Sequence, residues 1–180
     1  MTLELITGPM FSGKTSELIR RLRLAAAQGE RVCAGKPAID GDQGWLTSLA
    51  GPRLPASTLD DVDAIERLAV GASVVGVDEV QFLDAPAIYC LAQLADEGPR
   101  VIAAGLDLDY RGIPFPSVES LAAQASSITT LTGVCARCGA AATRSQRLLD
   151  GQPAASTTPT VLVGGPELYE PRCDECHEVR

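Results

Sequence analysis

The first fifteen residues of this chain place the strongest constraint on its fold. Leu3 to Thr7 is a mostly apolar stretch, and residues 8–15 read Gly-Pro-Met-Phe-Ser-Gly-Lys-Thr before a helical pattern begins. The two glycines allow backbone conformations that side chains forbid, so successive N–H groups can point at phosphate oxygens with a helix N-terminus behind them. A strand, a G-x-x-x-x-G-K-T loop and a helix in this order predict a phosphate-binding loop.

The side chains of this loop favour a nucleotide ligand. Lys14 can place a cation at the β- and γ-phosphates, and Thr15 can offer a hydroxyl to Mg²⁺. The alternative is a glycine-rich turn that holds no ligand, but such a turn needs no Lys-Thr pair at this offset. Lys14 is also one of only two lysines, the other being Lys36. The expected nucleotide-binding residues are Gly8, Pro9, Met10, Phe11, Ser12, Gly13, Lys14 and Thr15.

Length and charge limit the classes of protein that this chain can belong to. A chain of 180 residues can form one well-packed domain and a small second one. A net charge of −8 argues against nucleic acid as the main partner, because phosphate-backbone binding relies on clustered Lys and Arg. We find no signal-peptide pattern and no apolar segment long enough to cross a membrane. We therefore expect a cytoplasmic protein.

Apolar strands alternate with helical patterns over most of the chain. Helical spacing predicts helices over residues 15–28, 60–70, 84–96 and 118–125, and short apolar runs predict strands over 31–34, 72–77, 100–104 and 128–131. Residues 35–57 are rich in Gly, Pro and Asp and read as a long irregular loop. The alternation predicts an α/β domain over 1–131, with a mostly parallel sheet covered on both faces.

Two carboxylates follow the strand predicted over residues 72–77. Parallel strands present their carboxyl ends at one edge, so Asp78 and Glu79 should lie beside the phosphate loop. Asp78 is then the acidic partner of Thr15 for Mg²⁺. Glu79 points to another side and is free for proton chemistry. Because the chain has a single histidine, we expect any general base to be a carboxylate. A solvated turn is the alternative, but it leaves the phosphate loop without an acidic metal partner.

Four cysteines beyond Leu131 form two C-x-x-C pairs. Such pairs place thiolates on tight turns, which is the arrangement that a tetrahedral structural Zn²⁺ needs. A redox pair is an alternative interpretation for either motif alone. Four cysteines without a metal would leave reactive thiols in a small domain that has little hydrophobic core. His177 could replace one ligand, although an exposed neighbour is the simpler interpretation. The expected zinc ligands are Cys135, Cys138, Cys173 and Cys176.

The insert between the cysteine pairs predicts a β-ribbon. Residues 143–149 and 160–163 read as strands, and Asp150-Gly151 joins them to a Pro/Ala/Ser/Thr-rich stretch. Both ends of the ribbon would be pinned at the metal, so its loop could close over a ligand. We expect residues 132–180 to form a small zinc-ribbon-like lobe.

Taken together, these motifs resemble the cytosolic, zinc-containing thymidine kinases. The resemblance covers nearly the whole chain in order, and the combination is more specific than any single motif. The segments that carry it are Gly8–Thr15, Asp78-Glu-Val-Gln-Phe82, the loop from Gly105 to Phe115, the two cysteine pairs and Gly164-Gly-Pro-Glu-Leu-Tyr-Glu-Pro-Arg-Cys173.

The resemblance implies a RecA-like P-loop core and transfer of the γ-phosphate of ATP to the 5′-hydroxyl of thymidine, a small-molecule substrate. It implies Glu79 as the general base, Thr15 and Asp78 at Mg²⁺, and Gln81 beside ATP. It also implies a structural Zn²⁺, a lasso-like loop over the base and a homotetramer. The residues implied at the nucleoside are Met10, Phe82, Leu106, Tyr110, Val161 and Tyr169.

One segment departs from the family pattern. The family usually carries Asp-x-Arg-Tyr followed by Ser-His, whereas this chain has Asp40-Gly-Asp42-Gln-Gly-Trp45 and then Ser48-Leu49. Asp42 with Trp45 is the best alignment, and Asp40 is nearly as good. No alignment restores the arginine or the histidine.

The missing arginine leaves two interpretations open. Arg53, Arg111 or a partner subunit replaces it near the phosphates, or catalysis is weaker. The expected activity is thymidine kinase, with deoxyuridine as a further substrate. The alternatives are a protein of the same architecture that acts on another nucleoside, and one that binds nucleotide as a regulator or scaffold.

Overall fold

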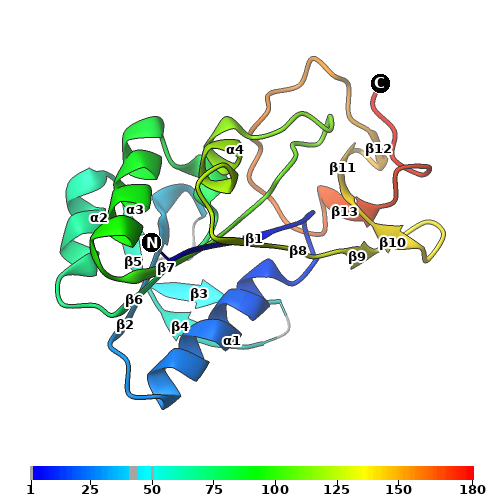
Figure 1. Ribbon diagram of the computed structural model, residues 1–180. Helices are drawn as coiled ribbons and strands as arrows, with labels where there is room; N and C mark the ends of the chain where they lie inside the picture. The colour runs from blue at the N-terminus through cyan, green and yellow to red at the C-terminus, as the bar shows by residue number, and fades with distance from the viewer. Residues whose placement is uncertain (1, 41–43, 50) are drawn as a thin grey trace.

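The computed structural model describes residues 2–40, 44–49 and 51–180. Its centre is a six-stranded sheet in the order β5-β2-β6-β7-β1-β8, and every neighbouring pair is parallel (Figure 1). The mostly parallel α/β architecture predicted from the sequence is therefore confirmed. The strands are β1 Leu3–Thr7, β2 Val32–Pro37, β5 Ser57–Leu59, β6 Val74–Val77, β7 Arg100–Gly105 and β8 Ser127–Thr130.

Helices cover both faces of this sheet. The α1 helix lies on one face together with a small antiparallel hairpin, and α2, α3 and α4 lie on the other (Figure 1). The helices are α1 Lys14–Ala27, α2 Val62–Ala69, α3 Ala85–Glu97 and α4 Pro116–Ala122, with short 3₁₀ turns η1 Ala38–Asp40 and η2 Val80–Phe82, and the hairpin is β3 Trp45–Thr47 with β4 Arg53–Pro55.

Alternating side chains in the strands build two cores. Leu3 and Leu5 of β1 pack with α2, α3 and α4, whereas Ile6 packs with Leu18 and Leu22 of α1. This two-residue period is expected where each face of a buried strand contacts a different layer. The strands are therefore apolar on both sides and hold the carboxyl edge of the sheet rigid.

Side-chain caps start two of the helices. The carboxylate of Asp61 accepts from the Ala64 N–H at 2.7 Å, and that of Asp84 accepts from the Ala87 N–H at 2.9 Å. These caps satisfy backbone donors that lack partners within the helix. The predicted cap at Asp84 is confirmed.

The C-terminal part contains only short antiparallel strands. β11 pairs with β12 on one side and with β13 on the other, and β9 pairs with β10 beside the cysteines. Their bounds are β9 Gly133–Val134, β10 Ala141–Ala142, β11 Arg144–Leu149, β12 Gln152–Pro153 and β13 Tyr169–Arg172.

Two predictions about strands were wrong. Residues 160–163 form no strand, because the partner of β11 is instead β13, close to the second cysteine pair. Residues 35–57 are less irregular than predicted, since β3 and β4 pair with each other and the end of β2 pairs with β5. Three-residue strands lack the length that makes alternation visible in a sequence.

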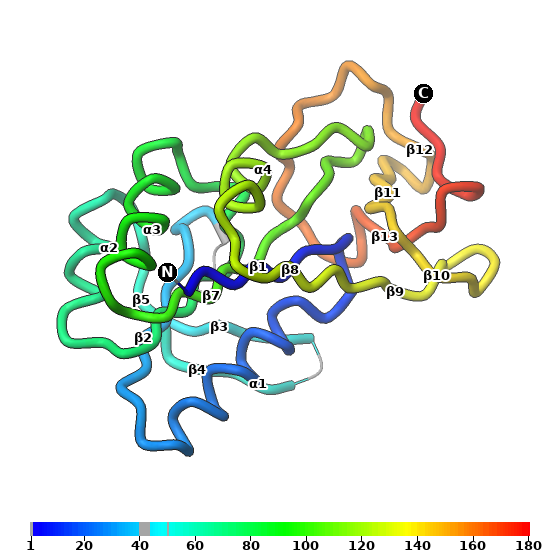
Figure 2. Tube along the Cα trace, viewed as in Figure 1, coloured from blue at the N-terminus to red at the C-terminus, as the bar shows by residue number. Residues whose placement is uncertain are grey.

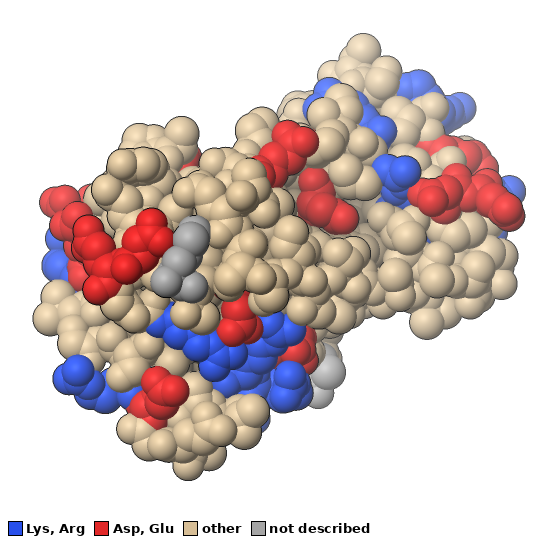
Figure 3. All heavy atoms as spheres, viewed as in Figure 1, with Lys and Arg blue, Asp and Glu red and all other residues tan. Residues whose placement is uncertain are grey.

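Arginines gather beside α1 on the face shown in Figure 3. Arg21 of α1 bonds Glu17 and Glu4, each at 2.8 Å, and Arg100 of β7 bonds the same Glu4 at 2.6 Å. Each guanidinium is thus compensated by a carboxylate, and the pairs tie α1 to β1 and β7. No helix within the described ranges is both long enough and apolar enough to traverse a bilayer.

Gly8 and Gly29 allow a matched test of the loop geometry. Both have positive φ, 141° and 85°, but a Cβ on Gly8 would lie 2.3 Å from the carbonyl oxygen of Leu131, whereas one on Gly29 would meet nothing within 4 Å. We expect Gly29→Ala to lower the free energy of unfolding by about 1–2 kcal/mol and Gly8→Ala to lower it by on the order of 3 kcal/mol. Urea unfolding measures both, and equal losses would contradict the close approach at Gly8.

Candidate active site

A cavity of about 350 Å³ opens at the carboxyl edge of the sheet. The phosphate loop, the β3–β4 hairpin, η2, the 105–115 loop, β11 and residues 160–164 all contribute to its wall. In Figure 2 the chain after β12 returns toward the α/β core beside the 105–115 loop. The predicted site residues that line it are Met10, Phe11, Gly13, Lys14, Thr15, Glu79, Gln81, Phe82, Leu106, Tyr110, Val161 and Tyr169.

The phosphate loop has the backbone that its sequence predicts. Gly8 and Gly13 have φ of 141° and 91°, and Phe11 between them has φ of 64°. Left-handed residues turn successive N–H groups toward one side and form a concave anion site. The hydroxyl of Ser12 is buried without a hydrogen-bond partner among the described residues, which fits a loop shaped around an anionic group.

Opposite charges meet behind the loop. Lys14 is the first residue of α1, and its ammonium donates to the Pro9 carbonyl at 2.8 Å. Burial lowers the pKa of Lys14, while Glu79, Asp78 and Asp107 oppose that shift. Lys14 is therefore a buried cation whose charge is opposed by the negative charge of three carboxylates.

Asp78 lies below the cavity rather than in its wall. It is 3% exposed, and burial followed by the charge of Glu79 raises its pKa to about 7. Hydrogen bonds from the Thr15 side chain and from the Glu79 N–H favour its charged form. The structure thus brings the two predicted Mg²⁺ residues into contact, and their oxygens are the ligand type that Mg²⁺ prefers.

Glu79 has a strained backbone and a defined partner. Its φ is 54°, which is uncommon for a residue with a side chain and often marks a functional position. The side-chain Nε2 of Gln81 donates to the Glu79 carboxylate, and the side-chain Oε1 of Gln81 accepts from the Leu106 N–H at 3.1 Å. Gln81 therefore connects the Glu79 carboxylate to Leu106, the residue after β7, and orients that carboxylate.

Part of the cavity wall is aromatic and aliphatic. Met10, Phe82 and Leu106 approach from the α/β core, whereas Val161 and Tyr169 approach from the C-terminal part. These side chains can pack on a flat ring without competing for its polar edge.

Tyr110 connects these two sides. It is 2% exposed, and its hydroxyl lies 3.0 Å from the carbonyl oxygens of Ala155 and Thr158 and 3.3 Å from that of Ser156. One hydroxyl donates to one carbonyl at a time. Tyr110 therefore holds the segment after β12 as well as lining the cavity.

Sequence reasoning missed two polar residues of β11 that line the cavity. The Ser145 hydroxyl accepts from the Met10 N–H at 2.9 Å, and the Arg147 guanidinium lies between Tyr110 and Tyr169. Their two-residue spacing places both on one face of a strand, but this signal alone does not distinguish a cavity wall from a solvated face.

The four predicted cysteines lie together. Their Sγ atoms are all within 4.8 Å of one another, and those of Cys138 and Cys173 are 3.6 Å apart. These separations suit four sulfurs around one Zn²⁺, because Zn–S bonds of about 2.3 Å set neighbouring sulfurs about 3.8 Å apart. The donor set therefore fits zinc.

His177 does not behave as an exposed neighbour of this cluster. Its ring is half-buried, and Nε2 lies 2.8 Å from the carbonyl oxygen of Tyr110. Burial lowers the pKa of His177. The histidine thus connects the turn at Cys176 to the loop that carries Tyr110.

The structure does not bring either candidate arginine to the cavity wall. Arg53 lies over the Trp45 ring at 4.5 Å, and Arg111 pairs with Asp109 at 2.6 Å. Asp40 ends η1, and Asp42 lies outside the described residues. In the described part of the chain, the basic residues that line the cavity are Lys14 and Arg147.

The departing segment does contribute to the cavity in another way. Thr47, Ser48 and Leu49 line it beside Ser16, and the hydroxyls of Ser16 and Ser48 are in contact. The hairpin thus closes the side of the cavity next to α1 with short polar groups.

Comparison with known proteins agrees with this geometry. The sequence model of the thymidine kinase family matches residues 1–177. A thymidine kinase of Thermococcus kodakarensis is 45% identical over 185 residues, covering 98% of this chain and 94% of the relative. One from Coprothermobacter proteolyticus is 46% identical over 179 residues, covering 98% and 90%.

Similarity to solved structures is weaker. The branch-migration motor RuvB of Thermotoga maritima matches 73% of this chain and 38% of its own, with 12% identity and a TM-score of 0.44, a level that carries no functional argument. The family model and the full-length relatives are decisive by themselves: this chain belongs to the thymidine kinase family.

Proposed function

We propose that this enzyme transfers the γ-phosphate of ATP to the 5′-hydroxyl of thymidine, with deoxyuridine as a further substrate. One observation carries the proposal: a single cavity joins a phosphate loop, a carboxylate at the carboxyl edge of the sheet and an aromatic pocket. Phosphoryl transfer needs positioning and charge neutralisation with a base near the acceptor, and this cavity supplies groups for each.

The ATP phosphates would lie on the backbone of residues 8–15 with Lys14 at the β- and γ-phosphates. Thr15 and Asp78 would hold Mg²⁺, which when bound neutralises charge on the phosphate oxygens. The hydrogen bond between the Thr15 side chain and the Asp78 carboxylate supports this assignment, because it brings two oxygen ligands together.

Glu79 would accept the proton of the 5′-hydroxyl. Glu79 lines the same cavity as the phosphate loop and the aromatic wall, and the amide of Gln81 donates to its carboxylate. A carboxylate suits this task, because His177, the single histidine, is held at the Tyr110 carbonyl.

The base would lie against Met10, Phe82, Leu106, Tyr110, Val161 and Tyr169. The N–H groups of residues 160–163 donate to no acceptor in the described part of the chain. Such donors could bind the carbonyl oxygens of a pyrimidine, so that polar side chains are not needed there.

We further propose that residues 1–131 and 132–180 are two domains, that the second holds a structural Zn²⁺, and that the enzyme is a cytoplasmic homotetramer without nucleic acid partners. The cysteine geometry supports the zinc, and the net charge of −8 supports the last point. The tetramer rests on the family resemblance.

Transfer of labelled γ-phosphate from Mg-ATP to thymidine tests the activity. We expect labelled thymidine monophosphate from the zinc-replete protein, and little product with deoxycytidine or without an acceptor. Transfer to deoxycytidine alone would indicate another nucleoside kinase. Bound ATP without transfer to any nucleoside would indicate a nucleotide-binding regulator.

Glu79→Gln tests the base. The amide keeps the shape of the side chain but cannot accept the proton, so we expect kcat to fall by about 10²–10⁴ while ATP binding is retained. Glu66→Gln, on the exposed side of α2, is the control that keeps wild-type kcat. Near-normal turnover of Glu79→Gln would refute the assignment.

Cys138→Ser tests the zinc site. The wild-type protein should contain about one zinc ion per chain, and the variant should lose it on dialysis and melt at a lower temperature because ligand binding contributes to folding. Cys33→Ser lies in β2, away from the cluster, and should keep its zinc. Atomic absorption and thermal unfolding give both readouts. Full zinc content in Cys138→Ser would contradict the proposal.

A further inference from the structure

Arg147 is a buried cation whose contacts differ from those of the other arginines nearby. It is 1% exposed, and none of its interactions with the described residues is with a carboxylate. Arg111 and Arg144, by contrast, pair with Asp109 and Asp174. A buried charge is retained only where other groups satisfy it, so its partners indicate its role.

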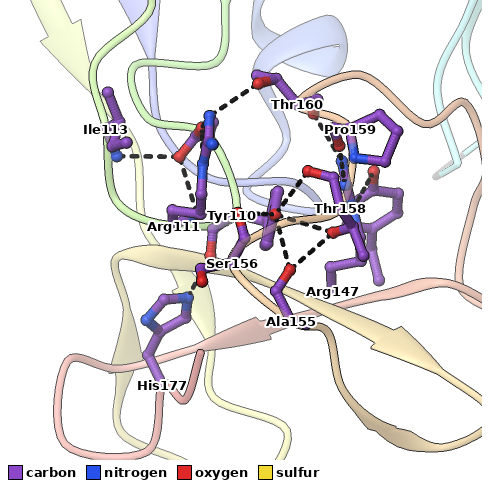
Figure 4. Close-up of polar contacts among 12 residues, drawn as sticks. Tyr110, Arg111, Ile113, Arg147, Ala155, Ser156, Thr158, Pro159, Thr160 and His177 are labelled. Atoms are coloured by element: carbon purple, nitrogen blue, oxygen red, sulfur yellow. Dashed lines mark hydrogen bonds and ion pairs between the residues drawn. The ribbon is translucent and has the colours of Figure 1, made fainter. Parts of the chain in front are cut away.

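The guanidinium of Arg147 is satisfied by backbone carbonyls and rings. Nη2 donates to the Thr160 carbonyl at 2.7 Å, and Nη1 donates to the Pro159 carbonyl (Figure 4). Its central carbon lies 4.0 Å from the centre of the Tyr110 ring and 5.2 Å from that of Tyr169, within cation–π range. The planar fork thus spans two consecutive peptide groups, which a lysine ammonium does not match.

Tyr169 extends this arrangement by one more carbonyl. Its hydroxyl accepts from Arg147 Nε at 2.9 Å and donates to the Leu162 carbonyl at 2.6 Å. Residues 159–162 have no strand or helix of their own, so these contacts define their path. Arg147 on the regular strand β11 therefore fixes an irregular segment of the cavity wall.

The same contacts orient the N–H groups of the segment. In a trans peptide unit the C=O and N–H point in opposite directions. Because the carbonyls of residues 159, 160 and 162 point at Arg147 or Tyr169, the N–H groups of residues 160, 161 and 163 point away from them. In the proposed function, these N–H groups are among those that donate hydrogen bonds to the carbonyl oxygens of the pyrimidine base.

We propose that Arg147 is a positioning residue for nucleoside binding, which holds residues 159–162 over the cavity and sets the direction of their N–H groups. The proposal rests on the proposed function for the identity of the nucleoside, but not for the structural role. It assigns Arg147 no contact with the reacting atoms, so the substrate affinity should depend on it more than the chemical step.

Arg147→Met keeps most of the side-chain volume and removes the donors. We expect the Ser156 and Thr158 amides, which donate to the Arg180 and Ala155 carbonyls, to exchange hydrogen at least about tenfold faster than in the wild type, and the KM for thymidine to rise by about tenfold or more. The kcat should change by less than about threefold, and the KM for ATP should not change, because the loss is one of binding.

Two variants make the comparison specific. Arg67→Met removes an arginine that is 70% exposed on α2, far from the cavity wall, and should leave exchange and kinetics unchanged. Arg147→Lys keeps the charge without the fork and should also raise the KM. It provides the same comparison if Arg147→Met does not fold.

Wild-type exchange at the Ser156 and Thr158 amides together with a wild-type KM in the Arg147 variants would overturn the proposal. A fall in kcat with an unchanged KM would also overturn it, since it would place Arg147 at the reacting atoms. If the wild type transfers no phosphate to thymidine, the proposed function fails, yet hydrogen exchange without nucleoside still decides whether Arg147 holds the segment.

Discussion

Parallel pairing of β1, β6 and β7 is the constraint on which the site depends. The register of these strands brings Thr7, Val77 and Gly105 to one edge of the sheet, so the loops that follow them meet. One loop is the predicted phosphate loop, the next carries Asp78 and Glu79, and the third carries Leu106 and Tyr110. Each strand is apolar on both faces, so two packed layers prevent the edge from shifting.

Buried charge distinguishes the two ends of the cavity. At the phosphate end, Lys14 and Asp78 are held at low exposure, and the pKa of Asp78 is raised to about 7 by burial and by Glu79. Such an arrangement suits a ligand that brings both anionic oxygens and a cation. At the other end, the buried guanidinium of Arg147 donates to the backbone carbonyls of Pro159 and Thr160, so the protein itself satisfies this charge.

Tyr110 connects the α/β core to the C-terminal part of the chain. Its hydroxyl contacts the segment after β12, its ring contacts Arg147, and its carbonyl oxygen contacts His177 beside the cysteine cluster. The turn that carries it is itself fixed, because Asp109 accepts from the N–H groups of Arg111 and Ile113 at 2.8 and 3.0 Å. Order at the cysteine cluster is thereby connected to order in the aromatic pocket.

The sequence by itself determined the features whose chemistry depends on local spacing. Each of these motifs can be recognised from a few neighbouring residues. They are the loop from Gly8 to Thr15, the Asp78-Glu79 pair after a buried strand, and the two C-x-x-C pairs. The main strands and helices were also predictable, because they are long enough for a period of two or 3.6 to show.

Only the tertiary structure decided which distant residues complete the site. Ser145 and Arg147 look like ordinary polar positions of a strand until β11 is placed against the phosphate loop and Tyr110. The partner of β11 proved to be β13 rather than residues 160–163, and the segment left without a strand became part of the cavity wall. The physical reason is that these contacts join groups far apart in the chain, so no local pattern encodes them.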